Sequence, residues 1–215
     1  GFRLAFEKLG AKCVFSSDID SFAQQTYCDN FGVVPNGDIT KIEAKQIPSF
    51  DILTAGFPCQ PFSYAGLCKG FEDQTRGTLF FDVCRILSYH KPKMFFLENV
   101  KGLVSHNGGK TMSTILENLN ELGYDVHWKV LSSLDFGLPQ KRERWYCVGF
   151  DKKVDFDFPR PIQKKAVLRD IIDLTDCNPA LKLSKFEHDR IQYHFLHCHE
   201  QERVQHDNSK YAPNT

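Results

Sequence analysis

The stretch FDILTAGFPCQPFS, residues 50–63, decides how the rest of the chain is interpreted. Its first half is a continuous apolar run, which is typical of a strand buried on both faces of a sheet. The run ends in a turn that places Cys59 between a proline and a glutamine. Taken alone, this cysteine could be a nucleophile, a metal ligand, half of a disulfide or a small buried side chain.

The composition indicates a folded protein with one sizeable core, because the 215 residues are 41% hydrophobic and 25% charged. The sequence contains no apolar run long enough to span a membrane, and its opening GFRLAFEKLG lacks the core of a signal peptide. We therefore expect a cytoplasmic protein without membrane attachment. The formal net charge is zero, so any nucleic-acid partner has to be argued from a local site.

Cysteine spacing disfavours both a disulfide framework and a zinc knuckle. The 8 cysteines are scattered and form no C-x-x-C pair. The segment FEHDRIQYHFLHCHE, residues 186–200, is rich in histidine, but its spacing matches no common structural zinc site. We expect no metal.

Apolar runs alternate with amphipathic segments along residues 1–150, and this alternation predicts a parallel α/β sheet. The expected strands are KCVFSSDID (12–20), FDILTAGFPC (50–59) and PKMFFLENV (92–100), followed by two more near 124–133 and 145–150. The expected helices are 1–10, 21–31, 78–90 and 110–122. After residue 150 the chain becomes charged and proline-broken, so we predict a catalytic domain over 1–150 and a linker with a second region over 151–215.

Chemistry-bearing side chains follow three of the expected strands. Asp18 and Asp20 end the first, Pro58, Cys59 and Gln60 follow the second, and Glu98 lies at the end of the third. In open α/β sheets, ligands bind beyond the carboxyl ends of the strands. The sequence therefore predicts an active site at this edge.

These residues also carry a family resemblance. GFPCQPFS (56–63), FFLENVKGL (95–103) and FGLPQKRERWYCVGF (136–150), in this order, resemble the cysteine, ENV and QxRxR motifs of bacterial restriction-modification cytosine-5 DNA methyltransferases. GFRLAFEKLG, SSDID and GDIT are similar to the cofactor-side motifs of the same family. The resemblance covers residues 1 to about 150 and implies a Rossmann-like sheet that uses S-adenosylmethionine and acts on double-stranded DNA.

The resemblance implies a role for each motif residue. Cys59 would add to C6 of cytosine and make C5 nucleophilic, Glu98 would act at ring N3, and Arg144 would meet O2, with Arg142 as its neighbour. Cofactor contacts are implied for Asp18 on the ribose, Ile19 and Asp38 on the adenine, and Leu79 and Pro58 lining the pocket. Contacts to DNA are implied for Ser63 and Arg76, which belong to a glycine-containing segment over 63–77, and for Gln60.

Each motif also has a plainer interpretation. A lone cysteine after a buried strand is usually packing, Glu-Asn at a strand end is usually a cap, and QKRER is usually an exposed charged run. Three such motifs in series favour the catalytic interpretation. The alternatives that stay open are a tRNA cytosine-5 methyltransferase of the same fold and a catalytically inactive module.

The family pattern also contains segments that we do not find in this sequence. A glycine-rich F-x-G-x-G opening is expected before Gly1, and a full target-recognition domain after residue 215. We therefore expect a sheet that is incomplete at both ends, and a chain that is inactive by itself. The resemblance also implies a cognate restriction endonuclease as a genetic partner.

Overall fold

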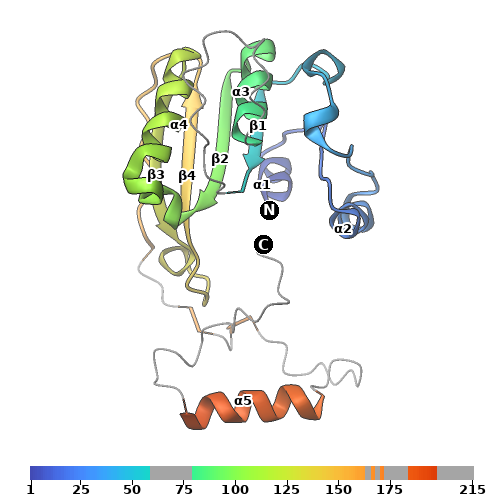
Figure 1. Cartoon of the computed structure of the whole chain (residues 1–215), viewed down its shortest axis with the longest axis vertical. Helices are drawn as coiled ribbons and strands as arrows, with labels where there is room; N and C mark the ends of the chain where they lie inside the picture. The colour runs from blue at the N-terminus through green and yellow to red at the C-terminus, as the bar shows by residue number, and fades with distance from the viewer. Residues whose placement is uncertain (59–78, 163–165, 168–169, 172–183, 198–215) are drawn as a thin grey trace. The chain divides into compact units, whose positions relative to one another are not determined.

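The computed structural model describes residues 1–58, 79–162, 166–167, 170–171 and 184–197 (Figure 1). The chain divides into two compact units, Gly1–Val167 and Leu168–Thr215. Each is described by itself below.

The first unit contains four helices and four strands within its described residues. The helices are α1 (Phe2–Lys8), α2 (Ser21–Phe31), α3 (Leu79–His90) and α4 (Lys110–Glu121). The strands are β1 (Ile52–Gly56), β2 (Met94–Val100), β3 (Asp125–Ser132) and β4 (Glu143–Phe150). Short 3-10 turns are η1 (Ile39–Lys41), η2 (Ala44–Gln46), η3 (Lys101–Val104), η4 (His106–Gly109) and η5 (Ser133–Phe136).

The four strands form one mixed sheet in the order β1-β2-β4-β3. Strands β1 and β2 are parallel, and β4 runs antiparallel to both of its neighbours. The carboxyl ends of β1 and β2 therefore lie at the same edge as the start of β4. This edge brings residue 56, residue 98 and residue 144 to one end of the sheet.

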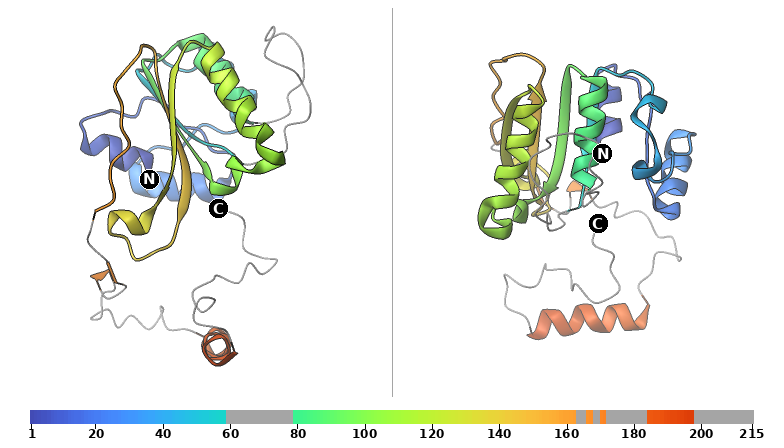
Figure 2. Two further views of the ribbon diagram at one scale, coloured as in Figure 1. Left: turned by 90° about the vertical axis from the view of Figure 1, so that its left-hand side faces the viewer. Right: turned by 45° about the horizontal axis from the view of Figure 1, so that its top comes forward.

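The hydrophobic core lies on one face of the sheet, beneath α3 and α4 (Figure 2). Both helices are amphipathic and bury apolar side chains at helical spacing, among them Phe80, Leu87, Ile115 and Leu119. Strand β2 alternates buried and half-buried residues, with Phe95 and Leu97 facing this core. The helix pair thus fixes which side chains of β2 face the opposite, more open side.

That opposite face is partly covered by α1. The rings of Phe2 and Phe6 lie edge-on to Phe96 of β2, with centroids 5.1 Å and 6.3 Å away. Helices α1 and α2 have no fully buried residue. The continuous apolar runs had predicted strands buried on both faces, but the described strands are covered fully on one face only.

The first expected strand, over residues 12–20, is not observed. Residues 12–20 do not join the sheet; within the described residues they pair only through an isolated parallel bridge between Ser17 and Asn36. A strand is held by a neighbouring ladder, and in the described part of the chain this segment lies beside a loop. The prediction of a wholly parallel sheet is also wrong, because β4 is antiparallel to β2 and β3. The four predicted helices are confirmed.

The second unit contains helix α5 (Lys185–His197) among its described residues. Ser184 precedes the helix, and Glu187 accepts hydrogen bonds from both its amide and its hydroxyl, at 2.8 Å and 2.7 Å. Across the described ranges of the whole chain, none of the helices combines the length and the apolarity that a membrane crossing requires.

Candidate active site

An ion pair between Glu98 and Arg144 lies at the carboxyl end of β2. Arg144 Nε is 3.0 Å from Glu98 Oε1, and the two side chains are 16% and 26% exposed, in the order Arg144 and Glu98. Arg144 Nη1 also donates to the Glu143 carbonyl at 2.9 Å. Arg144 engages Oε1 of Glu98, and within the described ranges the other oxygen, Oε2, makes no hydrogen bond.

The register of the sheet explains this pairing. Tyr146 is the direct partner of Glu98 across β2 and β4, and Arg144 is two residues away on the same face, a diagonal neighbour within reach of a long side chain. On the other side, Gly56 of β1 pairs with Glu98, and a Cβ built there would lie 3.6 Å from Glu98 Oε2. Gly56 itself is exposed among the described residues, so the Glu98 carboxylate lies beside a position of β1 that has no side chain.

Tyr146 is a member of this site that the sequence interpretation did not single out. Its ring packs against Phe96 with centroids 5.7 Å apart. Burial, and then the charge of Glu98, raise the pKa of Tyr146 above its ordinary value. The signal in the sequence was the strand period of two, which places residues 144 and 146 of the QxRxR segment on one face.

The backbone that leads to Cys59 is held in place at Phe57. Phe57 is buried, and its carbonyl accepts a hydrogen bond of 2.7 Å from Nδ2 of Asn99. Pro58 follows and is exposed. Cys59 itself, together with Gln60, Ser63 and Arg76, lies outside the described residues, so their predicted roles stay predictions. Asn99 is a second residue to which the sequence interpretation gave no role.

Arg142 lies in the turn between β3 and β4, where its side chain is exposed. Ser133 binds this turn: its amide donates to the Arg142 carbonyl at 3.0 Å, and its hydroxyl accepts from the Arg142 amide at 3.2 Å. Nearby, Lys101 Nζ and Glu143 Oε1 form an ion pair of 2.8 Å between η3 and the start of β4. Only Arg144 of the two arginines contacts Glu98 among the described residues.

Three of the predicted cofactor residues, Asp18, Ile19 and Asp38, lie near the bridge between Ser17 and Asn36. The Asp18 amide donates to the Asn36 carbonyl at 2.9 Å, and the Ser17 hydroxyl donates to the carbonyl of Gly37. These bonds place Asp18 and Ile19 beside the segment that carries Asp38. Ile19 is 72% exposed, so an apolar surface is open to a ligand next to two carboxylates.

Asp38 is held by the turn that it caps. Its Oδ1 accepts from the hydroxyl and the amide of Thr40, at 2.8 Å and 3.0 Å. The Thr40 hydroxyl bond, followed by the amide bond, holds the pKa of Asp38 below its ordinary value. Two carboxyl groups beside an apolar side chain suit the ribose hydroxyls and the amine of an adenosine, so these residues fit the cofactor that the resemblance implies.

No hydrogen bond or ion pair joins the catalytic group (Glu98 and Arg144) to the cofactor group (Asp18, Ile19 and Asp38) within the described ranges. Helix α3 instead contacts the segment that follows Asp38. Arg85 donates to the carbonyls of Ile42 and Ile39, each at 3.0 Å. Leu79, predicted to line the adenosine pocket, begins the same helix and packs against the core.

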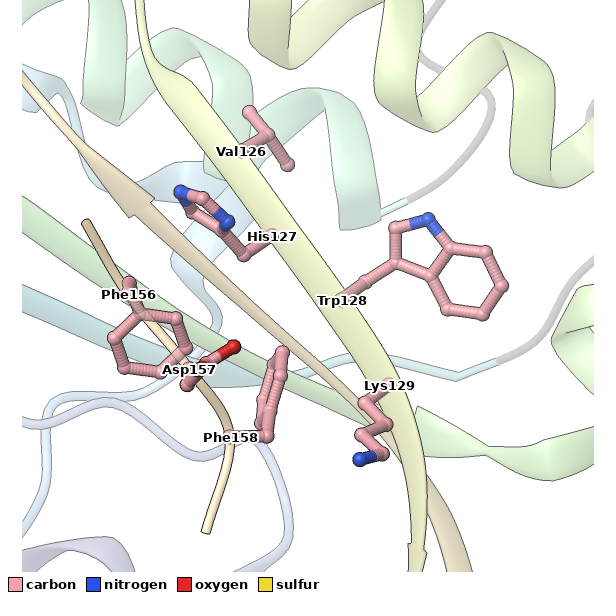
Figure 3. A pocket seen from close by; sticks show the side chains of 7 residues that line it. All are labelled: Val126, His127, Trp128, Lys129, Phe156, Asp157 and Phe158. Atoms are coloured by element: carbon pink, nitrogen blue, oxygen red, sulfur yellow. The ribbon is translucent and has the colours of Figure 1, made fainter. Parts of the chain in front are cut away.

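A shallow pocket lies elsewhere, along the outer strand β3 (Figure 3). The figure shows His127 and Lys129 on the same side of β3 as Phe156 and Phe158, with Trp128 pointing to the other side. None of the predicted site residues lines this pocket. The described residues also contain no cluster of three metal-ligating side chains.

Comparison with curated proteins gives close relatives. The chain is 54% identical to the type II methyltransferase M.NgoBI of Neisseria gonorrhoeae over 185 residues, which are 86% of this chain and 58% of the relative. It is 56% identical to M.HaeII of Haemophilus aegyptius over 83% of this chain and 56% of the relative. The chain thus spans somewhat over half the length of these two relatives.

Solved structures show the same fold. The Dnmt2 methyltransferase of S. pombe aligns with a TM-score of 0.58 at 26% identity, covering 71% of this chain and 48% of that one. The methyltransferase EhMeth of Entamoeba histolytica aligns with a TM-score of 0.60 at 20% identity, over 85% of this chain and 57% of that one. The family model for C-5 cytosine-specific DNA methylase matches residues 1–213, and the chain belongs to this family.

Proposed function

We propose that the protein is a DNA cytosine-5 methyltransferase of a restriction-modification system. It transfers a methyl group from S-adenosylmethionine to C5 of cytosine in double-stranded DNA. The observation that supports this most directly is the Glu98 to Arg144 pair of 3.0 Å at the strand edge where the chain leaves for Cys59. A DNA substrate in a bacterial-type system also places the protein in the cytoplasm, with a cognate endonuclease as its genetic partner.

In this proposal Cys59 is the nucleophile. Its thiolate adds to C6, which makes C5 an enamine-like carbon able to accept the methyl group. The cofactor, when bound, supplies that methyl group from its sulfonium sulfur, which becomes a neutral thioether. Loss of the C5 proton to solvent then allows the ring to expel the thiolate and regain its double bond. No cysteine atom is consumed, so Cys59 returns to its starting state.

Glu98 and Arg144 act on the charge that develops in the ring. Glu98 presents a carboxyl oxygen to N3 and the exocyclic amine, while Arg144 holds the other oxygen and stabilises negative charge at O2. The existing ion pair keeps both side chains in place before the base arrives, which removes part of the ordering cost. Asp18, Ile19 and Asp38 bind the adenosine, with Leu79 and Pro58 completing the wall. Gln60, Ser63 and Arg76 contact the DNA.

The test is covalent trapping. The 215-residue chain, and the same chain extended at both ends from its own gene, are incubated with cofactor and duplex DNA carrying 5-fluorocytosine. Fluorine cannot leave C5 as a proton does, so we expect the extended chain to give a denaturation-resistant adduct that maps to Cys59. The chain of 215 residues, which we expect to be inactive by itself, should give none. A parallel arm uses tRNA.

An adduct that persists in Cys59→Ala would contradict the nucleophile assignment. Methyl transfer to tRNA in preference to DNA would contradict the assignment of the substrate. Loss of trapping in Cys59→Ala, with the protein still folded, would support both the nucleophile and the reaction class.

A further inference from the structure

Asn99 is a buried polar side chain at the active-site edge whose amide is satisfied at both ends. It is 3% exposed. Its Nδ2 donates to the Phe57 carbonyl at 2.7 Å, and its Oδ1 accepts from the Val100 amide at 2.8 Å. Burial of an amide is costly unless such bonds are made, and asparagine supplies both the donor and the acceptor that this geometry uses.

The hydrogen bond from the Asn99 side chain to Phe57 takes the place of the next backbone hydrogen bond between β1 and β2. The parallel ladder between β1 and β2 ends at the pair of Gly56 and Glu98. Pro58 has no amide hydrogen, so the ladder cannot continue past this point. The Phe57 carbonyl is taken by the Asn99 side chain instead, while the backbone of Asn99 keeps pairing with Trp145 of β4.

Phe57 is therefore held from two sides. Its carbonyl is fixed by Asn99, and its ring is buried with its centroid 5.5 Å from that of Phe80 in α3. Cys59 is two residues further along the chain. The direction in which the chain leaves the sheet toward the thiol is thus set at Phe57, and Pro58 adds a fixed φ angle to that direction.

We propose that Asn99 is a positioning residue that acts through the Phe57–Pro58 backbone to place the Cys59 thiol for attack. The inference rests on the proposed function of Cys59 as nucleophile. Asn99 needs no contact with the base: it supplies one donor and one acceptor to the backbone. Aspartate has the same shape but no donor when ionised, and alanine supplies neither group.

The chain offers a matched control in Asn118 of α4. Asn118 is 2% exposed, and its Nδ2 donates to the Thr114 carbonyl at 2.7 Å. Burial and the length of the donated hydrogen bond are therefore nearly the same as for Asn99. The bond lies within a helix, however, and Asn118 Oδ1 is buried without a hydrogen-bond partner among the described residues. A purely structural role for Asn99 predicts that the two alanine variants behave alike.

The experiment compares Asn99→Ala with Asn118→Ala in single-turnover methylation, using the extended protein with saturating DNA and cofactor. A displacement of the nucleophile of about 1 Å can cost on the order of 100-fold in rate, and we expect a loss of this size for Asn99→Ala. The DNA dissociation constant should stay within about twofold of the parent, since Asn99 contacts no DNA. Asn118→Ala should lose thermal stability and keep its turnover rate.

Asn99→Asp gives a readout that a structural role would not move. Burial raises the pKa of a carboxyl, and a protonated Asp side chain can donate to the Phe57 carbonyl as the amide does. The rate of this variant relative to the parent should therefore rise as the pH falls from about 8 to about 6. A constant ratio across that range would contradict the proposal.

Alkylation of Cys59 by iodoacetamide, measured by peptide mass spectrometry with Cys13 as internal reference, tests Asn99 without turnover. We expect slower alkylation of Cys59 in Asn99→Ala and no change in Asn118→Ala. Equal rates in the two variants would overturn the proposal. If the parent protein failed to methylate DNA but Asn99→Ala still slowed Cys59 alkylation, the proposed function would fall and the positioning by Asn99 would stand.

Discussion

Residues 52–58 and 79–150 differ from residues 1–50 in how tightly their side chains are packed. The first region holds Trp145, Phe95 and Leu97 at no measurable exposure, between the sheet and two amphipathic helices. In the second region only Pro35, Ala44 and Ile47 are buried. The proposed catalytic pair is thus built on paired strands, whereas the proposed cofactor residues lie on a turn and beside a single bridge.

This difference separates two ways of building a site. Glu98 and Arg144 are placed by strand register, so their geometry exists before any ligand arrives. Asp18 and Asp38 are placed by local hydrogen bonds and by the contact of Arg85 with residues 39–42. We expect substitutions in the first region to affect chemistry and global stability, and substitutions in the second to affect ligand binding.

The largest effect is expected for Glu98→Gln, which keeps the shape of the side chain and removes the acid. Turnover should fall by about 100-fold or more, the scale of a general acid-base group, while DNA binding is retained. The Arg144 partner also loses its ion pair, so Glu98→Gln and Arg144→Gln should be strongly non-additive. Single-turnover rates with the double variant check this, and parental turnover in Glu98→Gln would exclude the assigned role.

A pair of glycine substitutions tests the packing contrast itself. Gly149 of β4 faces the Phe95 ring, and a Cβ there would collide with the ring. Gly37 in the amino-terminal region has open space around it. Gly149→Ala should cost about 1–3 kcal/mol or more in unfolding free energy by overpacking. Gly37→Ala should be close to neutral. Denaturant midpoints measure both, and equal midpoints would mean that the two regions are packed alike.

The link between the regions is tested by Arg85→Met, which keeps the apolar stem and removes both bonds to residues 39–42. Loss of hydrogen bonds to a charged group should weaken this segment by about 1–2 kcal/mol. Amide exchange should speed up at residues 39–47 and stay unchanged at residues 94–100. Lys45→Met is the control, because its ion pair with Glu43 is exposed on both sides and is screened by solvent.

Much of this organisation could be predicted from the sequence, and the failures have physical causes. Apolar periodicity and helix-capping residues located helices α1 to α4 and all four described strands, but helix α5 was not predicted. The segment 12–20 reads as a strand locally, yet a strand also needs a neighbour, and sequence period cannot show that its partner is a loop at Asn36. The antiparallel direction of β4 likewise depends on the turn at residues 133–142 and on its pairing with β2.

The sequence predicted the motif residues of the candidate site but missed residues that surround them. Glu98 and Arg144 stand out as charges in a pattern, and the structure brings them together. Asn99 and Tyr146 matter through a bond to a carbonyl and a position across a strand, which only the register reveals. Neither position is marked by an unusual residue type in the sequence.

The smallest effect is a pH dependence that comes from Tyr124 in the packed region. Burial, and then the charge of Asp151, raise the pKa of Tyr124 to about 12. Its hydroxyl donates to the Pro92 carbonyl at 2.9 Å, which requires the neutral phenol. An unfolded tyrosine loses its proton near pH 10, so above that pH the unfolded state binds fewer protons than the folded state.

The contribution of Tyr124 to stability should therefore be complete below about pH 10 and decline as the pH rises toward about 12. Tyr124→Phe removes this titration and should flatten the decline, at the expense of the bond to Pro92. Tyr89→Phe is the matched control, because Tyr89 is 61% exposed. Urea midpoints at several alkaline pH values measure the slope. The same slope in parent and Tyr124→Phe would show that the phenol gains no stabilisation from the core, and would weaken the contrast between the packed sheet and the amino-terminal region.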